Sequence, residues 1–119
     1  MILADTSVWI EHLRSGHRPL GALLDTGGVL AHPWVTGELA LGNLRDRDNV
    51  LRLLGRLPQA VVATDEEVLR VIDDETLYGA GIGYVDAQLL ASSRLTPDAR
   101  LWTNDQRLSR VAARLGVAS

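Results

Sequence analysis

Four acidic side chains stand among residues that should be buried, and carboxylates gathered in one place are suited to binding a divalent cation. Asp5 follows "MILA", Glu38 lies in "WVTGELALG", Asp86 lies in "GIGYVDAQLLA" and Asp105 closes "LWTND". Clustered carboxylates repel one another strongly at low dielectric, so such a cluster persists only with raised pKa values or with bound cations. Mg²⁺ and Mn²⁺ prefer oxygen ligands and leave coordination positions open for water and phosphate.

Each of these acids also has an ordinary interpretation. Asp5 and Asp105 could be N-caps of the helices that follow them, and Asp86 could be placed against a helix dipole. Glu38 could be a partly exposed helix residue. The local sequence identifies no basic partner for any of the four, so together they favour a shared site.

The elements that must position these acids alternate between short strands and helices. Strands are predicted at 1–4, 28–32, 59–64 and 99–103, with a further short strand at 117–119. Strands separated by helical patterns predict an α/β protein in which helices flank a small central parallel sheet of four to five strands. Because function collects at the carboxyl ends of parallel strands, Asp5 and Asp105 should face one crevice if their strands are neighbours.

Local signals mark the helices. Thr64 and Glu67 match a capping box at the start of "TDEEVLRVIDDETLYG". Val35, Leu39 and Leu41 are expected to face the core from the helix predicted in "PWVTGELALGNL". The segment "YGAGIG" is expected to be a loop, because each glycine inside a helix would cost about 1 kcal/mol.

The composition narrows the classes of function. The chain has 119 residues and no cysteine, which suits one domain spanning 1–119 without disulfides. Its twelve basic residues are all arginine, so a receiver domain and a P-loop enzyme, which both need a lysine, are excluded. An aspartyl-phosphate phosphatase would need an acid where Ser7 stands. No apolar run approaches the roughly 20 residues of a membrane span, so we expect a cytoplasmic protein with no membrane association.

The segments that carry the acids resemble a known family. "ADTSVWI", "VTGELALG", "GYVDAQLLASS" and "LWTNDQRL" are similar, in order, to the acidic motifs of PIN-domain ribonucleases, particularly the VapC-type toxins of bacterial toxin–antitoxin modules. By this resemblance the catalytic and metal-binding acids would be Asp5, Glu38, Asp86 and Asp105, with supporting hydroxyls from Thr6, Ser7 and Thr103. The resemblance also implies a three-layer, PIN-like fold, RNA cleavage with Mg²⁺ or Mn²⁺, a homodimer, and a VapB-like antitoxin that blocks the site.

The segment after the last acid departs from the pattern of many relatives. Where they carry further acidic and aromatic residues, this chain has Gln106, Arg107 and Leu108. The departure weakens the case for a second-metal ligand there. Arg107 is instead the best single candidate for binding a substrate phosphate, because the guanidinium fork matches phosphate geometry.

Other polar and aromatic residues keep two interpretations each. The arginines between 45 and 56 could bind RNA or form a solvated helix face paired with Asp46 and Asp48. Trp34 and Tyr84 could stack on bases, whereas Trp9 and Trp102 are better suited to a core or dimer contact. The histidines match no catalytic pattern: His32 is expected at a strand end or in a loop, and His12 and His17 are expected to be exposed.

A second class of function competes with the nuclease. The chain could be a catalytically inactive PIN-like module that binds a protein or RNA without cutting. Inactive members would be expected to lose one or more acids, and here all four are present.

Overall fold

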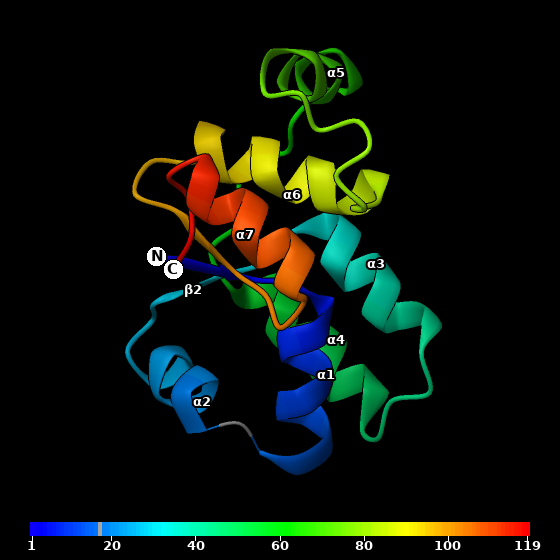
Figure 1. Ribbon diagram of the computed structural model, residues 1–119. Helices are drawn as coiled ribbons and strands as arrows, with labels where there is room; N and C mark the ends of the chain where they lie inside the picture. The colour runs from blue at the N-terminus through cyan, green and yellow to red at the C-terminus, as the bar shows by residue number, and fades with distance from the viewer. Residues whose placement is uncertain (17) are drawn as a thin grey trace.

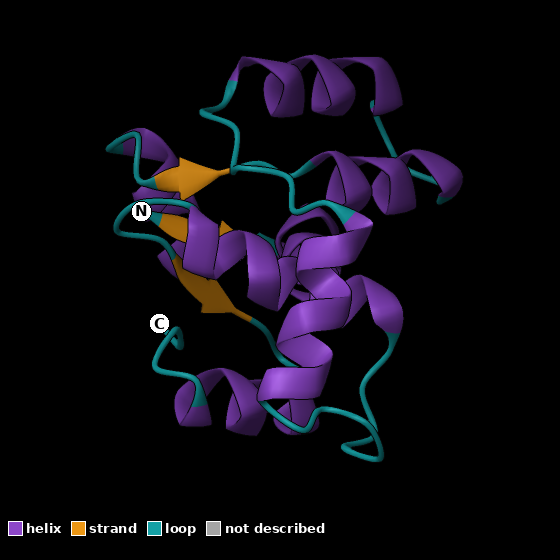
Figure 2. Cartoon of the chain, turned by 90° about the horizontal axis from the view of Figure 1, so that it is seen from above, coloured by secondary structure: helices purple, strands orange, loops and turns teal. Residues whose placement is uncertain are grey.

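The computed structural model describes residues 1–16 and 18–119. Three short strands form one parallel sheet in the order β2-β1-β3, where β1 is Ile2–Ala4, β2 is Val29–Leu30 and β3 is Arg100–Trp102. The helices are α1 (Thr6–Ser15), α2 (Arg18–Asp25), α3 (Pro33–Leu41), α4 (Arg47–Arg56), α5 (Asp65–Asp74), α6 (Tyr84–Leu95) and α7 (Gln106–Arg114). Helices surround the strands, and α5 stands outermost, packed on α6 (Figures 1 and 2). The α/β class with a parallel sheet flanked by helices is therefore confirmed.

The register of the sheet brings two predicted strand ends together. Ile2 lies opposite Val29 on one side and opposite Arg100 on the other, so β1 is the central strand. The Asp5 amide donates to the Trp102 carbonyl at 3.0 Å, which continues the ladder one step beyond β1. Asp5 and the segment after β3 therefore lie at the same edge of the sheet.

The sheet has three strands rather than four to five within the described residues. The segments at 59–64 and 117–119 each contribute a single parallel bridge, Ala31 with Gln59 and Leu101 with Ala118. After Gln59 the backbone leaves the sheet because side chains of α6 take its hydrogen bonds. Thr96 Oγ1 accepts from the Val61 amide at 2.8 Å, and Gln88 Oε1 accepts from the Ala63 amide at 3.0 Å.

The core is built from the apolar faces that the helical spacing predicts, with one error. Val35 and Leu39 on α3 are buried, as are Val50 and Leu54 on α4. Leu41, which was expected to face the core, is 91% exposed. Two residues correspond to about 200° around a helix, so a face that buries Leu39 turns Leu41 away from the core.

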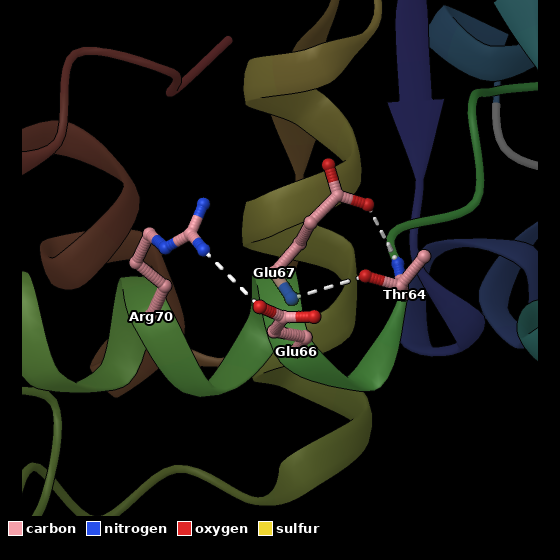
Figure 3. A network of polar contacts seen from close by, with 4 residues as sticks. All are labelled: Thr64, Glu66, Glu67 and Arg70. Carbon is pink, nitrogen blue, oxygen red and sulfur yellow. Dashed lines mark hydrogen bonds and ion pairs between the residues drawn. The ribbon is translucent and has the colours of Figure 1, made fainter.

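The outermost helix begins with the predicted capping box. Thr64 Oγ1 accepts from the Glu67 amide at 3.1 Å, and Glu67 Oε1 accepts from the Thr64 amide at 2.9 Å (Figure 3). An exposed ion pair between Arg70 and Glu66, 3.4 Å apart, follows one turn later. Inward-facing Val68 packs with Ala63, Ala87 and Ala91 in a small cluster, which attaches α5 to α6. The capping box and the apolar face together fix the position of α5.

A buried polar network ties α6 to the start of α3. His32 is fully buried at the end of β2 and caps α3, because its Nδ1 accepts from the Trp34 amide at 3.0 Å. Its Nε2 lies 2.9 Å from Ser92 Oγ and 3.3 Å from Gln88 Oε1. Since Nδ1 is an acceptor, Nε2 carries the proton and His32 is neutral in this arrangement. This is the strand-end position predicted for His32, but in a structural role.

The His32 network predicts a stability that depends on pH. Burial lowers the pKa of His32 below its ordinary 6.5, although the Gln88 hydrogen bond opposes this. The unfolded chain therefore takes up the proton more readily, so the stability is fully present above pH 6.5 and is lost as pH falls toward the folded-state pKa. We expect the parent to lose unfolding free energy relative to His32→Asn, at up to about 1.4 kcal/mol per pH unit, in urea unfolding from neutral to mildly acidic pH. A constant difference between the two proteins across that range would contradict this role.

None of the described helices is both long enough and apolar enough to cross a membrane.

Candidate active site

Asp5 is held at the carboxyl end of β1 as the N-cap of α1. Only 6% of it is exposed. Its Oδ1 accepts from the Ser7 hydroxyl at 2.5 Å and from the Val8 amide at 3.2 Å. The N-cap interpretation is therefore correct, but it uses Oδ1 alone, and Oδ2 has no hydrogen-bond partner among the described residues.

Asp105 occupies the equivalent position after β3, at the start of α7. Its Oδ1 accepts from the amides of Arg107 and Leu108 at 2.8 and 3.1 Å. Thr103 Oγ1 accepts from the Asp105 amide at 3.0 Å, which shapes the turn between β3 and α7. Asp105 is also an N-cap with one oxygen engaged.

Ser7 links the two strand ends. Its hydroxyl donates to Asp5 and accepts from the Asn104 amide at 3.0 Å. The Asn104 side chain in turn donates to Glu11 Oε2 at 2.7 Å. Asn104 therefore connects the loop after β3 to α1. Because part of this connection is a backbone amide, no residue type could have indicated it.

Glu38 approaches Asp5 from α3. It is exposed, and its Oε1 accepts from the Thr6 hydroxyl at 2.5 Å. Thr6 directly follows Asp5, so this bond joins α3 to the first residue of α1. The neighbouring hydroxyls therefore divide their roles, with Thr6 on Glu38 and Ser7 on Asp5.

Asp86 lies half-buried in the first turn of α6. Its Oδ2 accepts from the Gly83 amide at 3.2 Å. Burial raises the pKa of Asp86, and the negative charges of three other carboxylates raise it further, while the Gly83 hydrogen bond opposes the shift. Those three carboxylates belong to Asp105, Asp5 and Glu38. Each of these three acids therefore lies close enough to Asp86 for their negative charges to repel.

We call these four residues, Asp5, Glu38, Asp86 and Asp105, the acid cluster. In each carboxylate the fold engages one oxygen, and the second has no hydrogen-bond partner among residues 1–16 and 18–119. No described basic residue forms an ion pair with any of them. Over the same residues, no group of three or more His, Asp or Glu side chains is arranged so that it could already hold a metal ion.

The chemistry of the acid cluster nevertheless fits a hard divalent cation. All its donors are oxygens, it carries excess negative charge, and a half-buried member has no basic partner in the described chain. The hydrogen bonds that hold one oxygen of each carboxylate leave the other oxygen available to an ion. The carboxylates of the acid cluster are therefore spaced more widely than the ligands of a bound ion. Their oxygens are nevertheless the donors that such an ion requires.

Arginines lie at two places around the acid cluster. Arg107 is exposed two residues after Asp105. Arg14 and Arg45 line a hollow of about 440 Å³ next to Glu38, whose apolar wall includes Ile10 and Leu13. The expected pairing of the middle arginines with Asp46 and Asp48 is absent from the described residues. Arg47 instead donates to the Ala40 carbonyl.

Aromatic side chains flank the site on one side. Trp34 and Tyr84 lie against each other with ring centroids 5.8 Å apart, one turn before Glu38 and two residues before Asp86. Trp9 is fully buried in the core, as expected, and Trp102 is half-buried.

The other two histidines, His12 and His17, were both expected to be exposed. His12 is half-buried with its ring edge on Trp9, contrary to the expected exposure. His17 lies outside the described residues.

Comparison with known proteins identifies the family of this chain. A family model of the PIN domain matches residues 2–114, so the chain belongs to the PIN-domain family, whose ribonucleases are generally dependent on divalent metals. Two relatives share 52% identity over 118 residues, covering 99% of this chain and 95% of each relative. Both are named Ribonuclease VapC32, from Mycobacterium tuberculosis strains CDC 1551 / Oshkosh and ATCC 25618 / H37Rv. The resemblance to VapC-type PIN ribonucleases is thereby confirmed.

Proposed function

We propose that this chain is a metal-dependent endoribonuclease that hydrolyses RNA phosphodiester bonds and acts as the toxin of a VapBC-type toxin–antitoxin module. The observation that carries the proposal is that three carboxylates lie near the half-buried Asp86 and that no described basic residue forms an ion pair with any of the four. A divalent cation is the simplest group that makes such a site stable. The name of the relatives supports RNA as the substrate.

We assign Mg²⁺ or Mn²⁺ to the acid cluster. When bound there, such an ion would lower the pKa of a water molecule and offset charge on the phosphate. The chain's own contribution is orientation. Hydrogen bonds from backbone amides and from Thr6 and Ser7 fix one oxygen of each carboxylate, so that little side-chain freedom remains to be lost when an ion binds. Thr103 acts one step further away, by shaping the turn that carries Asp105.

We propose that RNA approaches over the rim of the acid cluster. The acids repel phosphate, so cationic side chains must hold the strand, and Arg107 is the nearest along the chain to one of the acids. The Trp34–Tyr84 pair offers aromatic surface on which an unstacked base could lie.

The same face suits an inhibitory partner. The hollow beside Glu38 combines apolar residues with Arg14 and Arg45, which fits a peptide with apolar and acidic side chains. We propose that a VapB-like antitoxin occupies it and so covers the acid cluster. We further propose, from the family resemblance, that the chain forms a homodimer and works in the cytoplasm, where its RNA substrate is found.

The competing function is that of a catalytically inactive PIN-like module. It would need no metal, and the acid cluster would then be a set of helix caps. Asp5, Asp86 and Asp105 do cap helices, which is what favours this alternative. It does not explain why three caps and Glu38 converge on one another without cations, because helix caps can be placed far apart at no cost.

Cleavage of a panel of structured RNAs decides between the two functions. With Mg²⁺ or Mn²⁺ the parent should cut at defined positions, and Asp5→Ala should be inactive because the site loses a buried ligand. If parent and variant are equally inert and a metal titration shows no binding, the nuclease is refuted and the binding module is favoured. Equal cleavage by both would show that Asp5 is not required.

Ser7→Ala should give a graded defect at the same site. It removes the hydroxyl that donates to Asp5 and accepts from the Asn104 amide. Loss of a group that orients a metal ligand typically weakens metal affinity about 10- to 100-fold, so cleavage should fall at low Mg²⁺ and recover at high Mg²⁺. Ser15→Ala, on the same helix but bonded only to the Glu11 carbonyl, is the matched control and should cleave normally. A defect in Ser7→Ala that high Mg²⁺ does not relieve would argue against this role.

A further inference from the structure

The side chain of Arg107 lies directly against Gly81, in the glycine loop that precedes α6. A Cβ atom at position 81 would lie only 3.1 Å from Arg107 Cδ and Nη1, and 3.5 Å from Cζ. Contacts that close require a neighbour to move. Gly81 also has a φ of 80°, a conformation that other residues rarely adopt. A side chain at position 81 would therefore push Arg107 away by a few tenths of an ångström, in addition to straining the backbone.

This contact joins two segments that each carry a member of the acid cluster. One is the start of α7, with Asp105, and the other is the loop that leads into α6, with Asp86. Arg107 is bonded through its amide to Asp105 Oδ1, at 2.8 Å. Gly81 lies two residues before Gly83, whose amide is bonded to Asp86 Oδ2 at 3.2 Å. Arg107 thus contacts the start of α7 through its amide and the loop before α6 through its side chain.

The guanidinium has no other structural task in the described chain. It forms no hydrogen bond and no ion pair with the residues the structure describes, although four carboxylates lie in the same region. An arginine kept at a fixed place without a protein acceptor has its donors free for an external anion. Phosphate is the anion whose geometry the guanidinium fork matches.

We propose that Gly81 is a positioning residue, which holds the Arg107 guanidinium at the rim of the acid cluster so that it binds a phosphate of the RNA strand. This inference rests on the proposed ribonuclease function. It assigns the phosphate contact to a pair of residues, and it explains why the loop needs glycine at position 81 in particular.

The test compares two glycines of the same loop. Gly79 has a φ of 76°, close to that of Gly81, but a Cβ there would meet nothing within 4 Å. Gly79→Ala and Gly81→Ala therefore carry the same backbone strain, and only the second displaces Arg107. The probe is a fluorescein-labelled single-stranded RNA of random sequence, with EDTA present so that it is not cut, and the readout is fluorescence anisotropy across a range of salt concentrations.

The expected pattern is specific to positioning. Arg107→Gln should weaken binding about five-fold near 0.1 M salt and reduce the slope of log affinity against log salt by about 0.7, the value for one phosphate on a single strand. Gly81→Ala should approach this result, Gly79→Ala should leave both values unchanged, and Gly81→Ala should have no further effect in an Arg107→Gln background. Non-additivity of this kind would not arise from general destabilisation.

Three outcomes would overturn the inference or its basis, and they differ from one another. If Arg107→Gln leaves the salt slope unchanged, Arg107 binds no phosphate. If Arg107→Gln lowers the slope but Gly81→Ala behaves like Gly79→Ala, then Gly81 does not position it. A folded parent that binds no RNA in EDTA and also cuts none with Mg²⁺ or Mn²⁺ would refute the proposed function itself, and with it this role for Arg107.

Discussion

Asp86→Asn should abolish RNA cleavage while making the metal-free protein more stable. The substitution removes a charge that burial and three neighbouring carboxylates make unfavourable, and the amide oxygen can still accept from the Gly83 amide. We expect cleavage to fall at least about 100-fold, because a metal ligand is lost. In EDTA the unfolding free energy should rise by roughly 0.5 kcal/mol, since water still screens part of the repulsion.

The pH dependence of the unfolding free energy tests the same prediction in a second way. Because the pKa of Asp86 is raised, the folded protein holds this proton more tightly than the unfolded chain does. The unfolding free energy of the parent should therefore decrease, relative to Asp86→Asn, as pH rises from 3.8 through the folded-state pKa. Urea unfolding measures this difference.

Asp98→Asn is the matched control for Asp86. Asp98 is an exposed loop residue with a φ of 59°, which asparagine tolerates, so both activity and stability should stay at the parent level. An Asp86→Asn protein that cuts RNA normally, or that is less stable than the parent in EDTA, would contradict the assignment of Asp86.

Mn²⁺ should stabilise the parent strongly and the Asp86→Asn variant weakly. A ligand that binds only the folded state adds about 2.7 kcal/mol at a hundredfold excess over its Kd. For a chain of this size that corresponds to a rise in Tm of about 10 °C. The stabilisation arises because the ion removes the repulsion within the acid cluster, so removal of the ion by EDTA should reverse both the Tm shift and the cleavage activity.

Differential scanning fluorimetry across a Mn²⁺ titration checks this expectation. The Asp98→Asn control should show the full shift. Equal Tm shifts in the parent and in Asp86→Asn would place the stabilising ion elsewhere on the protein.

The sequence predicted the parts of the fold that depend on local patterns. The capping box of Thr64 and Glu67 depends only on residues a turn apart, and it was predicted. The strand expected at 59–64 was wrong beyond Gln59, because Thr96 and Gln88 from a distant helix compete for its backbone hydrogen bonds. Such competition depends on tertiary packing, which no local pattern contains.

In the candidate site, too, some features could be predicted from the sequence and others could not. The acids stood out because each interrupts an apolar pattern, and the position of Asp5 and Asp105 after neighbouring parallel strands follows from the topology. The particular hydroxyl that meets each acid did not follow. Thr6 bonds to Glu38 whereas Ser7 bonds to Asp5, a choice set by the direction in which consecutive side chains leave α1. The contact of Arg107 with Gly81 could not be predicted from the sequence either, because it depends on glycine having no side chain.

The most direct test of the central claim is a crystal structure of the protein grown with Mn²⁺, examined for anomalous scattering from the metal. We predict a peak at the acid cluster, with carboxylate oxygens of Asp5 and Asp86 among its ligands. A peak bound elsewhere on the protein, or none although Mn²⁺ is present in millimolar excess, would contradict the claim that these distant acids form one cation site.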